Sequence, residues 1–471
     1  MTADRQIDIN DLENVWFVGA GGIGMAALER YFLSRGLRVG GYDRTETALV
    51  GALRAEGVEI TLNDSAEAIP AAFRDKATTL VVYTPAVPDS HPGLMWLREN
   101  GFTVMKRAAV LGLITRHSRA ICFSGTHGKT TTSCMAAHML QESGTGCNAF
   151  LGGILRNYGS NLLLSDTSPW SVVEADEYDR SFHHLRPTVA VVTATDPDHL
   201  DIYGTEDAYL ESFAHFTELI VPGGTLVVHT GLKLRPRTGK DVRTVTYSRD
   251  AGDYHASRIR IGDGSVTFDL VGPGGRILVA DVELGVPVAV NIDNAVAAMA
   301  ALDVAGLLDA ASARHAMASF RGPARRFEFH LREPGRAVID DYAHHPDELK
   351  ASIASVRALY PGRRLTVAFQ PHLYSRTRDF APAFAEALSM ADDVVLLDIY
   401  PAREEPIPGV TSRIIFDRIT APEKVMCGKS DLPDTLKKRN FEILLTAGAG
   451  DICDCLPQIV ADATGKTHTS K

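Results

Sequence analysis

The sequence is poor in cysteine, in long apolar runs and in positive charge. Only 6 of its 471 residues are cysteine, they are scattered, and the pair Cys453-x-Cys455 lacks further histidine or cysteine partners at zinc-site spacing, so we expect reduced thiols. No apolar run approaches the ~20 residues of a membrane-spanning helix, and the polar N-terminus is unlike a signal peptide. These absences favour a cytoplasmic protein that does not enter a membrane.

Charge and length narrow the class further. The formal net charge is −10, from 48 basic and 58 acidic residues, and this argues against nucleic acid or an anionic membrane as the main partner. The composition, 45% apolar and 23% charged, is typical of globular proteins. Division of the length by ~150 residues per domain predicts about three domains.

The most informative stretch is a glycine-rich turn between an apolar run at 119–123 and a helix-like run at 133–141. Its glycines let backbone N–H groups approach phosphates, and the helix N-terminus adds partial positive charge. The first glycine of the common G-x-x-x-x-G-K-[ST] form is replaced by Phe123, so an ordinary turn is the alternative. We interpret the turn as an ATP site formed by Gly125, Thr126, His127, Gly128, Lys129, Thr130 and Thr131.

A second glycine-rich loop, Gly-Ala-Gly-Gly-Ile-Gly at 19–24, follows the strand-like run 14–18. Asp43 lies about twenty residues further on, which fits a dinucleotide-binding fingerprint with the acid on a ribose. Another nucleotide diphosphate would satisfy the same N–H groups. A buried-strand candidate at 79–83 ends at Thr84, where a parallel sheet would present ligand-binding backbone.

Polar clusters follow two predicted strands of the central segment. The first holds Glu174, Asp176, Glu177 and Asp179, and the second holds Asp198, His199 and Asp201. The first is either a solvated turn or a cation site, and His199 of the second is either a structural or exposed histidine or a ligand of metal or phosphate. Thr130 would need a carboxylate to complete a Mg²⁺ shell, which favours the cation site.

The chain from 223 to 290 alternates short apolar runs with turns, which predicts a small β-rich extension on the α/β core. Asn294 then opens an alanine-rich helix, as a cap or as a ligand-binding residue. Arg325 and Arg326 could grip phosphate at a domain hinge or serve as surface charge. After about residue 329, four predicted strands each end in polar residues, as an open α/β sheet presents a site.

The combination of motifs resembles the Mur ligases, the ATP-dependent amide-forming enzymes of peptidoglycan synthesis. The motifs that carry the resemblance lie at 125–131, 174–179, 198–201, 291–294 and 325–327. Further motifs at 340–346, 370–378, 398–405 and 448–451 are similar to the branch that adds L-alanine to UDP-N-acetylmuramate. The resemblance extends from about 15 to about 452.

This resemblance implies an α/β protein of three domains. Residues 1–118 would form a Rossmann-like domain that binds the UDP-sugar. Residues 119–327 would form a P-loop ATPase-like domain with the small β extension, and 328–471 a Rossmann-like amino-acid-binding domain. The implied UDP-sugar contacts are Gly19, Gly21, Gly22, Gly24, Asp43 and Thr84.

The resemblance also implies the chemistry. ATP would phosphorylate the lactyl carboxylate of UDP-N-acetylmuramate, and L-alanine would attack the acyl phosphate. Lys129 would hold phosphates, Thr130 and Glu174 would ligate one Mg²⁺, and Glu174 and His199 a second. The implied residues beyond the central loops are Asn294, Arg325 and Asp341 on the nucleotide, and His344 and Arg376 on alanine and the transferred phosphate.

Other interpretations stay open. The recycling ligase of the same family attaches a preformed tripeptide to the same sugar nucleotide. An NAD-dependent oxidoreductase explains the loop at 19–24 but not Lys129, and a nucleotide-gated binding protein explains both loops without chemistry. Leu373 stands where some family members carry arginine, which leaves the alanine pocket open, and we expect a monomer or weak homodimer.

Overall fold

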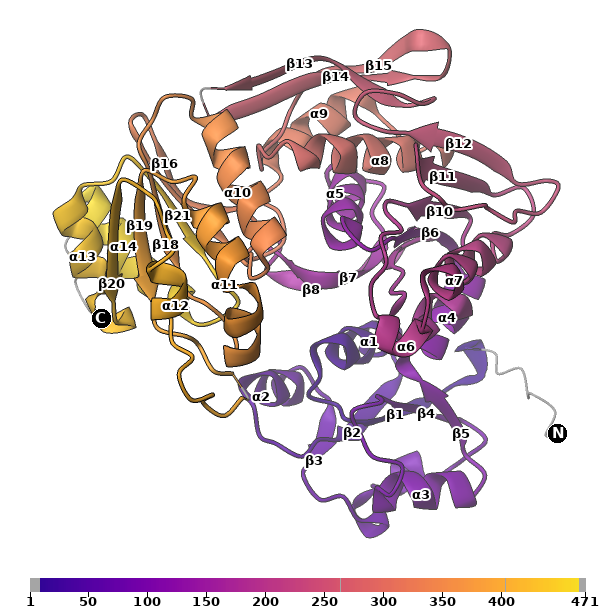
Figure 1. The fold of residues 1–471 in the computed structure, drawn as a ribbon. Coiled ribbons are helices and arrows are strands. Elements are labelled where there is room, and N and C mark those ends of the chain that lie inside the picture. The colour runs from indigo at the N-terminus through magenta and orange to yellow at the C-terminus, as the bar shows by residue number, and fades with distance from the viewer. Residues whose placement is uncertain (1–8, 263, 403, 466–471) are drawn as a thin grey trace. The chain divides into compact units, whose positions relative to one another are not determined.

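The computed structural model describes residues 9–262, 264–402 and 404–465 (Figure 1). Arg403, within one of the motifs above, lies outside the described residues. The chain divides into two units. The first comprises Met1–Ile154, Gly159–Tyr254 and Val296–Ser312, and the second comprises Leu155–Tyr158, His255–Ala295 and Ala313–Lys471.

A parallel five-stranded sheet in the order β3-β2-β1-β4-β5 lies in the first unit. Its strands are β1 (Asn14–Val18), β2 (Arg38–Tyr42), β3 (Glu59–Thr61), β4 (Thr79–Tyr83) and β5 (Thr103–Lys106). Its helices are α1 (Ile23–Ser34), α2 (Ala48–Ala55), α3 (Pro92–Glu99) and α4 (Arg107–Arg116), with 3₁₀ turns at Ile9–Asp11, Ala66–Ala68 and Ala71–Phe73. Every residue of β1 is buried, as expected of a central parallel strand. The predicted Rossmann-like arrangement of this segment is confirmed.

The first unit also contains a seven-stranded sheet in the order β12-β11-β10-β6-β9-β7-β8. Its strands are β6 (Arg119–Ser124), β7 (Asn148–Leu155), β8 (Ser160–Leu163), β9 (Trp170–Glu174), β10 (Val189–Val192), β11 (Thr225–His229) and β12 (Arg243–Tyr247). The helices are α5 (Lys129–Glu142), α6 (Leu200–Tyr203) and α7 (Glu206–Glu218), with a 3₁₀ segment at Tyr178–His184. The prediction that β11 and β12 belong to a separate extension is wrong, because α7 provides a crossover that lets β11 pair in parallel with β10.

One hydrophobic core joins these two sheets. It contains Val15 and Phe17 of β1 together with Ala120 and Cys122 of β6, all fully buried. The ring of Tyr31 on α1 meets the ring of Phe150 on β7 edge-on at 5.4 Å. The two glycine-rich loops therefore belong to one packed body.

The second unit contains an antiparallel three-stranded sheet of β13 (His255–Gly262), β14 (Ser265–Gly272) and β15 (Arg276–Glu283). This sheet corresponds to the predicted β-rich extension. A 3₁₀ turn at Pro273–Gly275 joins β14 to β15.

A six-stranded sheet in the order β16-β17-β21-β18-β19-β20 follows, parallel except for the β16–β17 pair. Its strands are β16 (Glu328–Glu333), β17 (Arg336–Asp341), β18 (Leu365–Phe369), β19 (Asp393–Leu397), β20 (Glu423–Cys427) and β21 (Ile443–Ala447). The helices are α8 (Val290–Val304) and α9 (Ala310–Ser319), each of which has residues in both units, and α10 (Pro346–Leu359), α11 (Tyr374–Leu388), α12 (Arg413–Phe416), α13 (Leu432–Arg439) and α14 (Leu456–Thr464), with 3₁₀ turns at Lys429–Asp431 and Ile452–Cys455. Within the described residues, no helix is both long and apolar enough to cross a bilayer.

Candidate active site

The loop between β6 and α5 has the backbone geometry of a phosphate-binding turn. Gly125 and Gly128 have φ angles of +132° and +84°, which favour glycine. A Cβ on Gly125 would lie 2.1 Å from Oγ1 of Thr193, so no side chain fits. No side chain caps α5, whose N-cap residue is Gly128. The first N–H groups of α5 therefore remain available to an anion.

The loop is anchored to the end of β10. Thr126 donates its backbone N–H to the carbonyl of Ala194 at 3.1 Å and its hydroxyl to the carbonyl of Asp196 at 2.7 Å. The Thr193 hydroxyl donates to the carbonyl of His127. Thr131 lies half-buried in the first turn of α5. The predicted ATP-binding residues 125–131 thus form a turn braced against the end of β10 and the first residues of α5.

Lys129 is held in place by a buried carboxylate. Its Nζ donates to the carbonyl of Gly125 at 2.7 Å and to Oε1 of Glu177 at 2.8 Å. The Glu177 side chain is 1% exposed, and its Oε2 has no hydrogen-bond partner. The sequence shows Glu177 within an acidic run, but it gives no sign that this member of the run is the one paired with Lys129.

Glu174, at the end of β9, lies beside Thr130. The Thr130 hydroxyl and the Gly152 N–H both donate to its carboxylate, the second at 3.0 Å. Burial raises the pKa of Glu174, against the opposing effects of these hydrogen bonds and of Lys129. The Thr130 hydroxyl and the Glu174 carboxylate are both hard oxygen ligands and lie close together, as ligands of one Mg²⁺ ion must.

His199 lies close to two acids, Glu177 of the loop after β9 and the adjacent Asp198 of its own loop. Its Nε2 is 4.0 Å from Oε1 of Glu177, and its Nδ1 is 3.7 Å from Oδ1 of Asp198. Within residues 9–262, 264–402 and 404–465, no group of three or more histidine, cysteine, aspartate and glutamate side chains is arranged to hold a metal. The second Mg²⁺ position, shared by Glu174 and His199, stays a prediction.

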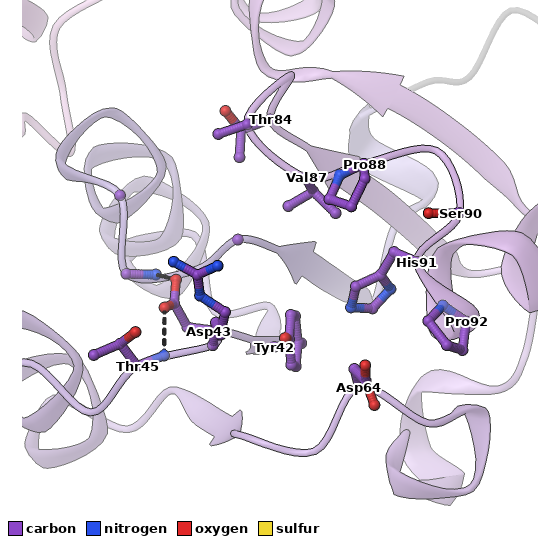
Figure 2. A pocket seen from close by; sticks show the side chains of 15 residues that line it. Tyr42, Asp43, Thr45, Asp64, Thr84, Val87, Pro88, Ser90, His91 and Pro92 are labelled. Carbon is purple, nitrogen blue, oxygen red and sulfur yellow. Dashed lines mark hydrogen bonds between the residues drawn. The ribbon is translucent and has the colours of Figure 1, made fainter.

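The other glycine-rich loop borders a pocket of about 630 Å³ (Figure 2). The pocket is lined by residues after β1, β2, β3 and β4, among them Gly19, Gly21, Gly22, Asp43, Asp64, Thr84 and His91. Gly19 has φ +93°, and a Cβ there would lie 2.6 Å from Cγ2 of Thr84. The helix that follows, α1, has no side-chain cap. The N-terminus of this helix therefore also offers N–H groups to a phosphate.

Asp43 supports this loop directly. Its Oδ2 accepts the N–H of Gly21 at 2.6 Å, and its Oδ1 accepts the N–H of Thr45 at 3.1 Å (Figure 2). The carboxylate therefore fixes the glycine turn, in addition to lining the pocket.

A cavity of about 80 Å³ lies between the loop at Gly24 and the carboxylate of Glu174. Its lining includes Gly24, Arg107, Asn161, Glu174 and Asp176. A Cβ on Gly24 would lie 3.1 Å from Nη1 of Arg107. Sequence reasoning missed Arg107, whose cationic side chain stands between the predicted UDP-sugar loop and the predicted metal carboxylate.

The remaining predicted site residues lie in the second unit. Asn294 donates to Oδ1 of Asn291 at 3.0 Å, within the first turn of α8. Arg325 donates to the carbonyls of Gly448 at 2.6 Å and Gly450 at 3.0 Å, so it clamps the loop after β21. The contact of Arg325 with the nucleotide stays a prediction.

Asp341, His344 and Arg376 follow strand ends of the same six-stranded sheet. Asp341 accepts hydrogen bonds from the Ser352 hydroxyl and the Phe327 N–H, and burial raises its pKa. His344 holds the carbonyl of Tyr342 through Nδ1 at 2.9 Å. Nη1 of Arg376 is buried without a hydrogen-bond partner. The strand order brings these residues to one sheet edge, as the sequence predicts.

Comparison with known proteins assigns all three segments to one family. The model of the Mur ligase family catalytic domain matches residues 14–119, that of the Mur ligase middle domain matches 123–302, and that of the Mur ligase glutamate ligase domain matches 325–451.

Relatives match over almost the whole chain. A UDP-N-acetylmuramate–L-alanine ligase of Phocaeicola vulgatus is 57% identical over 454 residues, 96% of this chain and 98% of the relative. One from Porphyromonas gingivalis is 53% identical over 444 residues, 94% and 97% of the two chains. The crystal structure of a UDP-N-acetylmuramate-alanine ligase from Thermotoga maritima has a TM-score of 0.75 at 29% identity, covering 96% of this chain and 100% of that one. A murein peptide ligase from Psychrobacter arcticus, at 19% identity and TM-score 0.58, covers 98% and 100% and shares the fold.

Proposed function

The chain belongs to the Mur ligase family, and from this premise we propose that it joins L-alanine to the lactyl carboxylate of UDP-N-acetylmuramate at the expense of ATP. The observation that carries the proposal is the pair of glycine-rich loops within one packed core. One loop carries Lys129 at an uncapped helix, and the other borders a pocket large enough for a nucleotide sugar. The choice of L-alanine as the amino acid follows from the relatives at 57% and 53% identity, which are UDP-N-acetylmuramate–L-alanine ligases.

The reaction passes through an acyl phosphate. The γ-phosphoryl group of ATP is transferred to the lactyl carboxylate, and ADP leaves. The neutral amine of L-alanine then attacks the acyl carbon, and the tetrahedral intermediate expels inorganic phosphate to leave UDP-N-acetylmuramoyl-L-alanine.

The protein contributes position and charge to both steps. Lys129 and the N–H groups of α5 neutralise the terminal phosphates. Arg107, which lines the cavity between Gly24 and Glu174, is suited to hold the lactyl carboxylate, and the loop braced by Asp43 is suited to hold the diphosphate of the sugar nucleotide. ATP and the lactyl carboxylate are both negatively charged and would otherwise repel one another. The positive charges of Lys129 and Arg107 reduce this repulsion and allow the two reactants to approach.

Thr130 and Glu174 would hold a Mg²⁺ ion, because their oxygens already lie within hydrogen-bonding distance and both are hard ligands. When bound, such an ion supplies positive charge beside the phosphates. His344 and Arg376 are proposed to meet L-alanine and the transferred phosphate, and Asn294, Arg325 and Asp341 the nucleotide. The domain limits, the oligomeric state, the cytoplasmic location and the lack of nucleic-acid and membrane partners remain predictions.

The test is release of inorganic phosphate with ATP, Mg²⁺ and UDP-N-acetylmuramate, with either L-alanine or the recycling tripeptide as acceptor. We expect phosphate with L-alanine alone and none in the Lys129→Met variant. Phosphate with the tripeptide alone would assign the enzyme to the recycling branch instead. A folded protein that binds ATP and is silent with both acceptors would refute the ligase assignment, and NADH oxidation without ATP would favour an oxidoreductase.

A further inference from the structure

Tyr203 connects the acidic loop after β9 to the loop after β10. It is the last residue of α6 and is 5% exposed. Its hydroxyl donates to the backbone carbonyl of Glu177, and its ring lies under the guanidinium of Arg180 at 4.8 Å. One side chain therefore touches both ends of the segment 177–180.

That segment has a backbone that requires external support. Asp179 and Arg180 have φ angles of +51° and +55°, in the left-handed region that residues other than glycine rarely occupy. Such conformations persist where the surrounding structure holds them. The ion pair between Asp179 and Lys106 is nearly half-exposed on both sides and provides weak support, so the buried Tyr203 is the stronger support of the two.

Tyr203 is itself oriented by a chain of polar groups. Nε2 of His183 lies 3.1 Å from the carbonyl of Ser212, which can only accept, so Nε2 carries the proton. It lies 2.9 Å from Oγ of Ser212, which in turn is 3.4 Å from the Tyr203 hydroxyl. The Ser212 hydroxyl is thus free to donate to Tyr203, whose own hydrogen goes to Glu177. The Ser212 and Tyr203 hydroxyls can therefore both donate in the direction of the acidic loop.

We propose that Tyr203 is a positioning residue for the ATP site. By fixing the backbone of Glu177, it sets the buried carboxylate that directs the ammonium of Lys129 along the β6–α5 loop. Tyr203 touches no reacting group and acts through Glu177. The inference rests on the proposed function, because it assigns Lys129 to the phosphates of ATP.

The experiment compares Tyr203→Phe with Tyr254→Phe. Tyr254 is a matched control in the same unit, 1% exposed, and its hydroxyl donates to Oδ2 of Asp303 at 2.7 Å, away from both loops. Each variant loses one hydrogen bond of a tyrosine hydroxyl, and because the Tyr254 bond goes to a carboxylate, Tyr254→Phe should lose at least as much stability as Tyr203→Phe. We expect the dissociation constant of Mg-ATP, measured by calorimetry, and the KM for ATP to rise about 5- to 20-fold in Tyr203→Phe alone, the range of one lost hydrogen bond to a buried group.

The KM for UDP-N-acetylmuramate should stay unchanged in both variants, because Tyr203 does not touch the pocket at Gly19. A Tyr203→Phe variant that melts earlier but binds Mg-ATP as the wild type does would overturn the inference. In a Glu177→Gln background, Tyr203→Phe should raise the dissociation constant of Mg-ATP by a smaller factor than in the wild type. If the factors of the two single variants multiply in the double variant, the inference is also overturned. ATP binding is measured without turnover, so a failure of the L-alanine reaction in the wild type is a separate result.

Discussion

Lys129 and Glu177 form an ion pair that is almost withdrawn from water: Nζ and Oε1 are 2.8 Å apart, and the side chains are 14% and 1% exposed. The loss of one partner from such a pair leaves an uncompensated buried charge, which costs about 3 to 5 kcal/mol. Single and double variants of this pair should therefore distinguish an effect on stability from an effect on activity.

We expect Lys129→Met to lower the Tm clearly and to abolish phosphate release. In Lys129→Met/Glu177→Gln the buried charge is gone, so the Tm should recover most of the loss while activity stays absent. Thermal unfolding followed by circular dichroism, with phosphate release in parallel, checks both statements. Equal Tm values for the single and double variants would show that Glu177 does not depend on Lys129 for its burial.

Gly125→Ala should disable ATP binding. The new Cβ would lie 2.1 Å from Oγ1 of Thr193 and 2.7 Å from the backbone nitrogen of Ala194, so the loop must move. Gly144→Ala is the control, since Gly144 also has a positive φ, +76°, but nothing lies within 4 Å of its Cβ position. The control should lose about 1 kcal/mol of stability and keep wild-type affinity for Mg-ATP. Similar affinities in the two variants would contradict the close packing of the loop.

Asp43→Ala should weaken the binding of the sugar nucleotide and leave the binding of ATP unchanged. Loss of the carboxylate frees the N–H of Gly21, and hydrogen bonds to a charged acceptor correspond to about a 10-fold change or more in affinity. The KM for UDP-N-acetylmuramate should rise accordingly at constant KM for ATP. Asp75→Ala serves as the control, because Asp75 caps the N–H of Ala77 at 2.9 Å outside the pocket. An equal rise for both variants would point to general destabilisation.

Glu29 should make the first unit less stable as the pH rises. It is fully buried on α1, neither carboxylate oxygen has a hydrogen-bond partner, and burial raises its pKa well above the ordinary value. Below about pH 4.3 it is protonated in both the folded and the unfolded chain. Above that pH the unfolded chain ionises first, so the free energy of unfolding falls, by up to about 1.4 kcal/mol per pH unit, until the folded pKa is reached.

Glu29→Gln removes this titration. The variant should therefore gain Tm relative to the wild type above about pH 4.3, with the difference growing as the pH rises and levelling off once the folded-state pKa is passed. Thermal scans of both proteins across this range provide the measurement. Parallel curves would show that the carboxylate is not the source of the pH dependence.

The sequence predicts the elements that carry the site because their signals are local. Apolar runs followed by glycine or polar residues mark β1, β6, β9 and β10, and the strand order places β6 between β9 and β10. Lys129, Glu174 and His199 are thereby brought to neighbouring strand ends, as predicted. The edge strand β20 escapes prediction because Glu-Lys-Val-Met-Cys is only half-buried and lacks an apolar run.

What the sequence does not contain is the pairing between distant side chains. Glu177 and Lys129 are 48 positions apart, and Tyr203 and Glu177 are 26 apart, so neither contact has a local signal. Asp43 shows the same limit. A carboxylate at this spacing suits either a ribose or the N–H of Gly21, and the structure shows that it holds the latter.

Gly152 reserves the space that the Glu174 carboxylate occupies. A Cβ at this exposed position of β7 would lie 2.2 Å and 2.3 Å from the two carboxylate oxygens, while the glycine has no positive φ that a larger residue would strain. In a scan of all single substitutions, position 152 should therefore yield variants that are made in normal amount but release no phosphate. Loss of function at this position would arise from an enzyme that is present in full amount, and no chaperone or compensating stabilising mutation would restore it.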